Sequence, residues 1–533
     1  MKFFRPGYWQ KLVLFLIFLI QFLAVVTLLV MLIDFAGSRG YEFLIWVIGF
    51  AFIADIATAV YIFSTPSPDV YKLSWLFAVF LIPVGGVLMY VFFANKQTNR
   101  RQRHKLRKYR EPIEHEPSLP ETAEALKNEH IDAYRISNYL EAKSHGGIHR
   151  NTSVKFFALV DDAFEPILEE LRKAQHFIYL EFFIVAPGVF WNSMLEILKE
   201  KASAGVDVRF IYDDVGSLTT APIGYAQTLT KMGVKTICYN KFRPFIDIRM
   251  NNRDHRKILV IDGHTCFSGG FNLADEYINK LERFGHWKDN AILIKGEAVA
   301  NFTNMFLATW VAAQAFDEKK LRHVVKKVEL AKAKGLAPKA YINEAGGFPE
   351  NDGYVQPYGD LPFDGEAVGE RVYIDLINAA HDHLYMVTPY LIIDKEMENA
   401  MIHAAWRGVD IRLLTPHIPD KKAVFNLTRS YYGNLIRAGV RVYEYTPGFV
   451  HEKTFICDGR MATVGTINLD YRSLYLHLEC GTFMVGCSCI KDMEKDFLET
   501  LEKSEEITYA HWRHWRDRQY WYWAVLSILG PFL

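Results

Sequence analysis

The chain has 533 residues, of which 50% are hydrophobic and 23% charged, and its formal net charge is zero. At about 150 residues per domain, this length allows a membrane part followed by two or three folded domains. The balanced charge does not favour nucleic acid as a partner. Six cysteines without a C-x-x-C pair do not favour a zinc ribbon or a redox motif. We expect reduced, buried thiols in a reducing compartment.

The first part of the chain, residues 1–110, is predicted to be a membrane anchor with two to three transmembrane helices. The candidate spans are the apolar stretches 12–33, 43–63 and 75–93. Each approaches or exceeds the roughly 20 residues that cross the hydrocarbon core, although the first could instead lie in the membrane interface. A basic run without acids follows at 96–110. Such a run marks the cytoplasmic side and attracts anionic lipid head groups, so we expect the rest of the chain in the cytoplasm.

The remaining chain has an α/β pattern that occurs twice, because short apolar strands alternate with helical stretches. A repeat of this length indicates duplicated domains. The corresponding segments are 176–180 with 383–387, 205–209 with 408–412, and 289–296 with 479–486. We predict a first domain at 111–330, a second domain at 331–505 and an aromatic and basic tail at 506–533. Between the domains, the basic, helix-prone stretch 319–340 and the Gly/Pro-rich stretch 346–362 are predicted to form a surface connector. The tail either lies in the membrane interface or packs on the second domain.

Each half carries one copy of the same polar motif. The first copy begins at His255 and the second at His451, and both have Lys at +2, Asp at +7, Gly at +14 and Asn at +17 from the His. A single His-x-Lys on a strand is common and carries little information. A five-position pattern that occurs twice indicates a site. The residues concerned are His255, Lys257, Asp262 and Asn272 in the first half, and His451, Lys453, Asp458 and Asn468 in the second.

Both copies are predicted to form a β-hairpin, because Asp-Gly favours a two-residue turn between β-prone runs. The expected pairs are Lys257 with Ser268, His255 with Gly270 and, in the second copy, His451 with Thr466. Side chains alternate along a strand, so His, Lys and Asn share one face. The two aspartates fall at the turns. There they are expected to build the structure or to orient a neighbour, and not to touch a substrate.

Two such half sites brought together suit a phosphodiester. Lysines and amides hold the non-bridging oxygens and stabilise developing charge. One His attacks phosphorus and the other protonates the leaving oxygen, then deprotonates the incoming hydroxyl. No metal or other cofactor is needed, since the lysines supply the positive charge. Asp289 and Glu479, which begin equivalent strands, are candidates for fixing the tautomer of a His; the alternative places them in solvent.

The repeated pattern resembles the phospholipase D superfamily, and longer stretches are similar to bacterial cardiolipin synthases. These stretches are 75–90, 252–257, 269–277, 388–391, 429–432, 443–453 and 468–473. The resemblance implies two pseudo-twofold-related α/β/α domains with the site at their interface. It also implies His255, Lys257, Asp262, His451, Lys453 and Asp458 as the catalytic motif residues. The family often has Ser after the motif glycine, where this chain has Gly270 and Thr466.

The activity implied by the resemblance is transfer of a phosphatidyl group from one phosphatidylglycerol to another, giving cardiolipin and glycerol. His255 is favoured as the nucleophile and His451 as the acid/base, with the reverse left open. A phospholipase D-type hydrolase has the same residues but uses water as the acceptor. A non-catalytic membrane scaffold is disfavoured because both half sites are intact, and a nuclease is disfavoured by the apolar N-terminal stretches. The expected partners are phosphatidylglycerol, other anionic phospholipids and the membrane.

Overall fold

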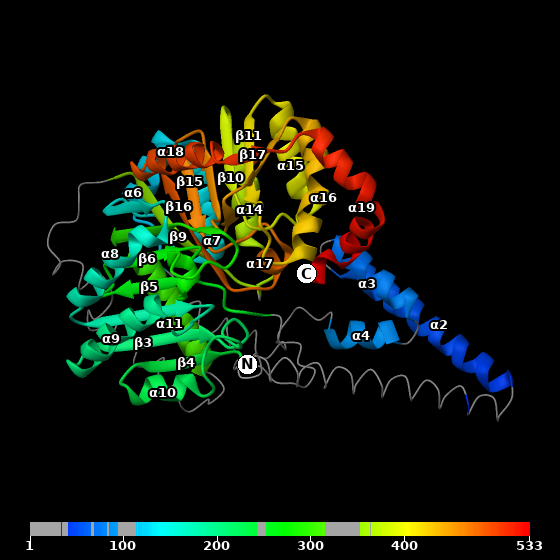
Figure 1. Ribbon diagram of the computed structural model, residues 1–533, viewed down its shortest axis with the longest axis horizontal. Coiled ribbons are helices and arrows are strands. Elements are labelled where there is room, and N and C mark those ends of the chain that lie inside the picture. Colours follow the sequence, from blue (N-terminus) through cyan, green and yellow to red (C-terminus); the bar gives the residue numbers. More distant parts are fainter. Residues whose placement is uncertain are drawn as a thin grey trace.

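The computed structural model describes residues 34, 41–65, 69–82, 85–93, 113, 116–241, 252–314, 352–362 and 364–532. Two mixed β-sheets with helices around them form the body of these residues (Figure 1). The predicted span at 12–33, the basic run at 96–110 and the first part of the connector, 319–340, lie outside the described residues. In the second part, 346–362, the prediction of a surface connector is wrong, because Tyr354–Asp360 form a buried edge strand of the second sheet.

The first sheet has seven strands, and the predicted α/β pattern of this half is confirmed. Its order is β1 (Thr152–Phe157), β8 (Ala291–Gly296), β6 (Thr265–Gly269), β5 (Ile258–Ile261), β2 (Phe177–Phe182), β3 (Asp207–Asp213) and β4 (Lys235–Tyr239). Strands β2, β3 and β4 are parallel to one another. The other neighbours in the sheet are antiparallel.

The second sheet repeats this arrangement and adds one strand at its edge. Its order is β17 (Ser504–Glu506), β12 (Arg441–Tyr445), β11 (Asp410–Pro416), β10 (His383–Val387), β14 (Thr454–Cys457), β15 (Met461–Gly465), β16 (Glu479–Val485) and β9 (Tyr354–Asp360). Strands β10, β11 and β12 are parallel, like their counterparts β2, β3 and β4. The internal repeat predicted from the sequence is therefore present in the fold.

Helices cover the outer faces of both sheets and also lie between the sheets. The outer helices are α8 (Val160–Lys173), α9 (Val189–Ser203) and α10 (Tyr225–Lys231) on the first sheet, and α14 (Val368–Ala379), α15 (Lys395–Trp406) and α16 (Lys422–Ala438) on the second. Helix α8 shows why these segments are helical: Val160, Ala163, Ile167 and Leu171 recur every three or four residues and are all buried.

The inner layer joins the two halves through one shared core. Helices α11 (Val299–Gln314) and α18 (Cys489–Leu501) contribute Phe302 and Phe497 to this core. Strands of both sheets contribute as well, for example through Ile258 and Ile456. The two halves are therefore packed as one body, which fixes the position of one motif relative to the other.

Helices α6 (Pro120–Glu129) and α7 (Ile131–Ser144) precede the first sheet in the chain but pack on the second half. Their buried residues Leu126 and Leu140 share a core with Val372 of α14. The domain boundaries predicted at 111, 331 and 506 stay predictions.

The N-terminal helices are α2 (Tyr41–Ser64), α3 (Asp69–Leu81) and α4 (Gly85–Phe93), and they extend away from the body (Figure 1). In the part of the chain that the structure describes, no helix has both the length and the apolar composition needed to cross a membrane. The predicted span at 43–63 falls on α2. The one at 75–93 is divided between α3 and α4, which are assigned as separate helices. The transmembrane predictions are therefore not confirmed.

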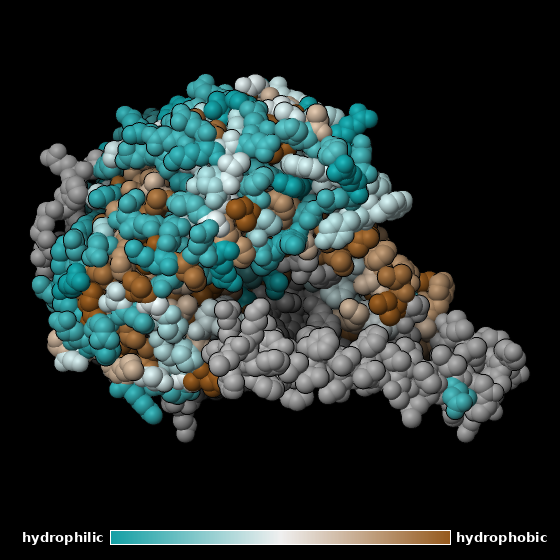
Figure 2. Space-filling view, in the orientation of Figure 1, coloured by the Kyte–Doolittle hydropathy of each residue, from teal (hydrophilic) through white to brown (hydrophobic). Residues whose placement is uncertain are grey.

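The C-terminal tail forms helix α19 (Tyr509–Leu529) and the short 3-10 helix η3 (Gly530–Phe532). One face of α19 packs on α16, where Trp512 lies so close to Gly433 that a Cβ at Gly433 would be 2.3 Å from the indole ring. On the other face, the side chain of Trp521 is 80% exposed. Figure 2 shows apolar residues gathered where the end of α19 meets α3.

The two motif hairpins are present, but their predicted register is wrong by one residue. Ile258 pairs with Ser268 and Ile261 with Thr265, so the loop has three residues and not two. In the second copy, likewise, Thr454 pairs with Val464. The reason lies in Asp262, which has a left-handed backbone (φ 50°) and whose amide bonds Phe177 O across to β2. Because of this hydrogen bond, Asp262 does not pair with β6 and belongs to the loop of the hairpin.

Candidate active site

The two motif histidines stand shortly before β5 and β14 in the chain. The backbone amide of each is hydrogen-bonded to a carbonyl oxygen of the other half. The amide of His255 donates to Leu478 O at 2.9 Å, and the amide of His451 donates to Lys288 O at 2.7 Å. Both side chains are buried, with 7% of each residue exposed.

Short strand pairings between the halves produce these contacts. Strand β7 (His286–Lys288) runs parallel to β13 (Gly448–Val450), and a parallel bridge joins Asp254 to Leu478. In each pairing, the residues before one histidine lie beside the residues before the other half's acid. Each His therefore faces an acid from the opposite half.

The two acids are hydrogen-bonded to the histidines, as predicted. His451 Nδ1 lies 2.7 Å from Asp289 Oδ2, and His255 Nδ1 lies 2.9 Å from Glu479 Oε1. The partners are separated by 162 and 224 residues, and the sequence did not indicate that they cross between the halves. Because the carboxylate holds Nδ1, Nε2 is the nitrogen of each ring left for chemistry.

The motif lysines are fully enclosed beside the histidines. Lys257 Nζ donates to His255 O at 2.5 Å, and Lys453 donates to His451 O. Burial lowers the pKa of Lys257 to about 8 and that of Lys453 to about 7. Burial, together with the charges of both lysines, also lowers the pKa of each histidine well below its usual value. The imidazoles are therefore neutral at neutral pH, as a nucleophile requires.

The two acids are supported differently in the two halves. Thr466 Oγ1 donates to Glu479 Oε2. The corresponding residue beside Asp289 is Gly270, where a Cβ would lie only 2.2 Å from Asp289 Oδ1. Gly270 therefore makes room for Asp289 but offers no hydrogen bond. Burial raises the pKa of Asp289 to about 8.

The motif asparagines are buried and bonded to the protein. Asn272 Nδ2 donates to Tyr277 Oη at 2.6 Å, and its Oδ1 accepts from Ile184 N at 3.0 Å. Asn468 Nδ2 donates to Ser473 Oγ at 3.1 Å. The phosphate-binding role predicted for both residues stays a prediction.

The motif aspartates bond backbone amides at the start of the central strands. Asp262 accepts from the amides of Gln175, His176 and Phe177 at 2.7 to 2.8 Å. Asp458 accepts from His381, Asp382 and His383 at 2.8 to 3.0 Å. Each stands at the turn, at the opposite end of β5 or β14 from the motif histidine. They hold the hairpin to the sheet and do not touch the reacting groups.

Several aromatic side chains that lie at the site were not predicted from the sequence. The rings of Trp287, Tyr277 and Phe449 lie 5.5 to 5.8 Å from the His451 ring. Phe183 and His477 lie 5.0 and 5.6 Å from the His255 ring. Trp287 and His477 each stand two residues before an acid of the site. Their shared position, two residues before a candidate acid, could have been used to predict both from the sequence.

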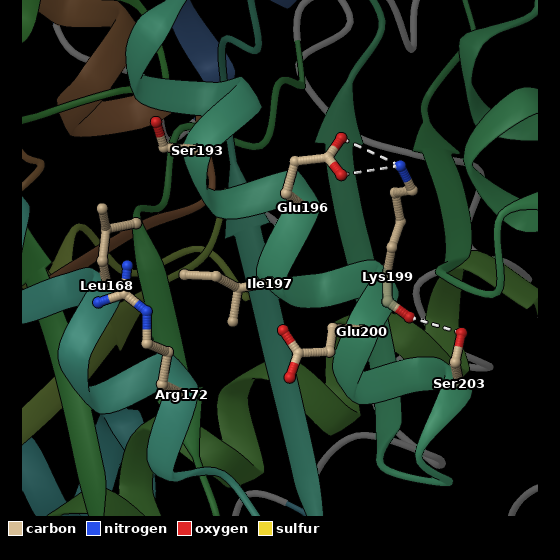
Figure 3. A pocket seen from close by; sticks show the side chains of 8 residues that line it. All are labelled: Leu168, Arg172, Ser193, Glu196, Ile197, Lys199, Glu200 and Ser203. Carbon is tan, nitrogen blue, oxygen red and sulfur yellow. Dashed lines mark hydrogen bonds and ion pairs between the residues drawn. The ribbon is translucent and has the colours of Figure 1, made fainter.

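The surface also has a hollow of about 670 Å³ between α8 and α9. Figure 3 shows its lining, in which Glu196 is ion-paired with Lys199. None of the motif residues lines it, so it is separate from the histidine site.

Comparison with known proteins agrees with this geometry. The family described as "Cardiolipin synthase, PLD-like domain" matches residues 167–310 and 373–501, and the "Phospholipase D-nuclease N-terminal" family matches residues 53–95. A phosphatidylserine synthase structure from Haemophilus influenzae covers 75% of this chain and 100% of its own, with a TM-score of 0.54 and 15% identity. That likeness concerns the fold.

A duplicated α/β fold with two His-Lys half sites defines a phospholipase D-like protein. The chain is 32% identical to a cardiolipin synthase of Halalkalibacterium halodurans, over 92% of this chain and 95% of the relative. It is 34% identical to a cardiolipin synthase of Geobacillus thermodenitrificans, over 86% and 88%. An uncharacterized protein of Streptococcus mutans is 41% identical over 85% of this chain and 94% of its own length. The chain belongs to the cardiolipin synthase family.

Proposed function

We propose that this chain is a cardiolipin synthase, a phosphatidyltransferase that joins two phosphatidylglycerol molecules into cardiolipin and releases glycerol. The observation that carries the proposal is the pair of neutral imidazoles, each oriented by an acid from the opposite half, beside two buried lysines. The membership of the cardiolipin synthase family supports the same substrate.

In the first step, Nε2 of His255 attacks the phosphorus of the donor lipid. The bond to the glycerol oxygen breaks, and His451 supplies the proton that this oxygen takes up. The phosphatidyl group is left on His255. Lys257 and Lys453 offset the charge of the phosphate oxygens. The bound phosphodiester anion also raises the pKa of His451, so this imidazole takes up one proton from solvent before it donates that proton to the glycerol oxygen.

In the second step, the glycerol hydroxyl of another phosphatidylglycerol attacks the same phosphorus. His451, now neutral, takes the hydroxyl proton, and the bond from phosphorus to His255 breaks. The products are cardiolipin and the free His255. Both enzyme groups return to their starting states, so the cycle is balanced without a co-reactant.

We assign His255 as the nucleophile because of the difference between the two acids. A phosphorylated imidazole carries positive charge that an ionised carboxylate stabilises. Asp289, with its pKa raised to about 8 by burial, is protonated at neutral pH. Both oxygens of Glu479 lie close to His255 Nδ1, at 2.9 and 3.0 Å, and Oε2 also accepts a hydrogen bond from Thr466, so the carboxylate is held in place beside this ring. The carboxylate beside His255 is therefore the better partner for the intermediate.

The proposal is tested with purified full-length protein and acyl-labelled phosphatidylglycerol. We expect labelled cardiolipin, with one glycerol released per cardiolipin formed. His255→Ala and His451→Ala should each lose activity by at least about 1,000-fold, whereas His264→Ala, on the loop of the first hairpin, is the matched control. Phosphatidic acid as the sole product would show a hydrolase and overturn the proposal. A phosphatidyl adduct trapped on His451 would reverse the assignment of the roles.

We also propose that the N-terminal segment attaches the protein to the cell membrane as a multi-pass anchor, with the two pseudo-twofold-related domains in the cytoplasm. The apolar side chains on α2 and α3 support this, since Phe50, Phe63 and Leu73 are 76%, 66% and 62% exposed in the isolated chain. The match of residues 53–95 to a family of N-terminal segments supports it as well. We further propose that the exposed face of α19 lies in the interface beside this anchor.

The position of α19 is tested by fluorescence quenching with brominated phospholipids in vesicles containing the protein. Trp521, exposed on α19, should be quenched, so Trp521→Phe should lower the quenched fraction. Trp191, fully buried in the first core, provides the control, because Trp191→Phe should leave the quenched signal in place. Equal quenching in the wild type and Trp521→Phe would contradict contact between α19 and lipid.

A further inference from the structure

His477 is an imidazole at the site that the proposed reaction does not use. Its side chain is 11% exposed, and within the described residues neither of its ring nitrogens has a hydrogen-bond partner. Its Nδ1 lies 3.6 Å from Glu479 Oε1, just beyond hydrogen-bond length. A buried polar group without a partner is costly and calls for an explanation.

The surroundings of His477 form a ligand set for a metal ion. One ligand atom each from His255, His477 and Glu479 lies within 4.8 Å of the others. Two imidazole nitrogens and one carboxylate oxygen are a common ligand set for Zn²⁺ when a fourth position is open. Oε1 of Glu479 lies 2.9 Å from His255 Nδ1 and 3.6 Å from His477 Nδ1. Oε2 lies 3.0 Å from His255 Nδ1 and accepts the hydrogen bond from Thr466. Such a bond to the remaining carboxylate oxygen orients a metal ligand.

The backbone fixes the three ligands relative to one another. The His255 amide bonds Leu478 O at 2.9 Å, between the other two ligands in sequence, and the His477 amide bonds Arg472 O at 3.0 Å. On this fixed backbone, side-chain movement has to bring three ligand atoms that lie within 4.8 Å of one another to about 2.1 Å from one ion.

The other half of the molecule provides a natural control. Trp287 stands before Asp289 as His477 stands before Glu479, and its ring lies 5.5 Å from His451. An indole has no lone pair to offer a metal. The three-ligand set is therefore confined to the side of the site that carries His255.

We propose that His255, His477 and Glu479 form an inhibitory site for a divalent transition-metal ion such as Zn²⁺. To bind the ion, Nδ1 of His255 presents its lone pair, and the proton that it shares with Glu479 moves to Nε2. Nε2 then has no lone pair with which to attack phosphorus. Metal binding thus converts the nucleophile to its unreactive tautomer. The inhibition rests on the proposed function, whereas binding of the ion does not.

Inhibition is tested by titrating the full-length enzyme with Zn²⁺ while following cardiolipin formation. We expect activity to fall and to return when a chelator is added. In His477→Asn the Zn²⁺ concentration for half inhibition, with activity normalised to the metal-free variant, should rise by at least about tenfold. Trp287→Phe is the matched variant in the other half and should keep the wild-type value. Equal Zn²⁺ sensitivity in the wild type and His477→Asn would overturn the proposal.

Binding is tested separately with Co²⁺, whose visible absorption reports nitrogen and oxygen ligands. The wild type should develop Co²⁺ bands that Zn²⁺ displaces, and both His477→Asn and His477→Gln should lose them while keeping the wild-type thermal midpoint. Bands that persist in both folded variants would place the metal elsewhere and overturn the site. This readout holds even if the chain does not make cardiolipin, so failure of the metal site and failure of the proposed function are distinguishable.

Discussion

The motif aspartates act on the backbone, at a distance from the chemistry. Asp262 accepts three amide hydrogen bonds with one carboxylate and sits in the left-handed region at φ 50°. Asp tolerates this conformation better than most residues. Asp suits this position for two reasons: its short side chain accepts the three hydrogen bonds, and its backbone tolerates the left-handed conformation.

We predict that Asp262→Ala lowers the free energy of unfolding by about 2 to 3 kcal/mol, because it leaves backbone amides without a charged acceptor. Asp458→Ala should cost less, since two of its three donor amides belong to exposed positions. Denaturant unfolding followed by tryptophan fluorescence measures both. A larger loss in Asp458→Ala than in Asp262→Ala would contradict the assignment.

The lysines set the alkaline limit of the reaction. Lys453 and Lys257, with pKa values lowered by burial to about 7 and about 8, lose their charge as the pH rises through this range. The phosphate of the substrate needs that charge, and once bound it raises the lysine pKa values in return.

We therefore predict that kcat/KM, which reports the free enzyme, falls more steeply as the pH rises above about 7 to 8, where loss of the lysine charge adds to loss of protonated His451, while kcat holds to higher pH. On the acid side, activity should persist below the usual histidine pKa, because the histidine pKa values are lowered. Initial rates measured in mixed micelles as a function of pH test both the acid and the alkaline side of the profile. A kcat/KM that stays flat to about pH 9 would show that the lysines keep their charge.

At the scale of elements, β7 and β13 connect the two halves beside the site. Lys288 on β7 lies 3.0 Å from Glu452, next to His451, and 2.9 Å from Asp496 on α18. Although burial opposes it, these two carboxylates raise the pKa of Lys288 above its usual value. The charged cluster fixes β7 to the second half, and Lys288 O in turn bonds the His451 amide.

We predict that Lys288→Met destabilises the protein by about 3 to 5 kcal/mol, because it leaves buried carboxylates without their cation. The double variant Lys288→Met with Glu452→Gln should recover part of this loss, since one uncompensated charge is removed. Thermal unfolding of the single and double variants forms the test. A double variant as unstable as the sum of the single changes would show that the pair is not coupled.

At the scale of the whole molecule, one chain supplies a complete site. Both acid–histidine hydrogen bonds run between the two halves of the same chain, and the halves share one core. The duplication therefore produced an enzyme in which neither half has an oriented histidine without the other.

We predict that a mixture of the His255→Ala and His451→Ala proteins stays inactive, because each site lacks one imidazole. Cardiolipin formation by the mixture, compared with the same amount of wild type, is the measurement. Recovery toward about a quarter or half of wild-type activity would indicate that halves of different chains combine into one site.

From the sequence alone one can predict the α/β class, the duplication, the two hairpins and the residue types of the site. These features depend on short stretches of sequence or on a repeat. Alternating apolar residues predict strands, and Asp-Gly predicts a turn. The two copies of His, Lys and Asn can be recognised by comparing the two halves of the sequence. The acids at 289 and 479 were found in the same way, from their equivalent places at the start of a strand.

The way in which these parts come together depends on the tertiary structure. The crossing of Glu479 to His255 and of Asp289 to His451 depends on strand pairings between the halves, and no local pattern encodes a partner 162 or 224 residues away. The three-residue loops follow from the bonds of Asp262 to the segment before β2, and His477 gains its place beside His255 only through the same crossing. Contacts between distant segments depend on packing, and packing is a property of the whole fold.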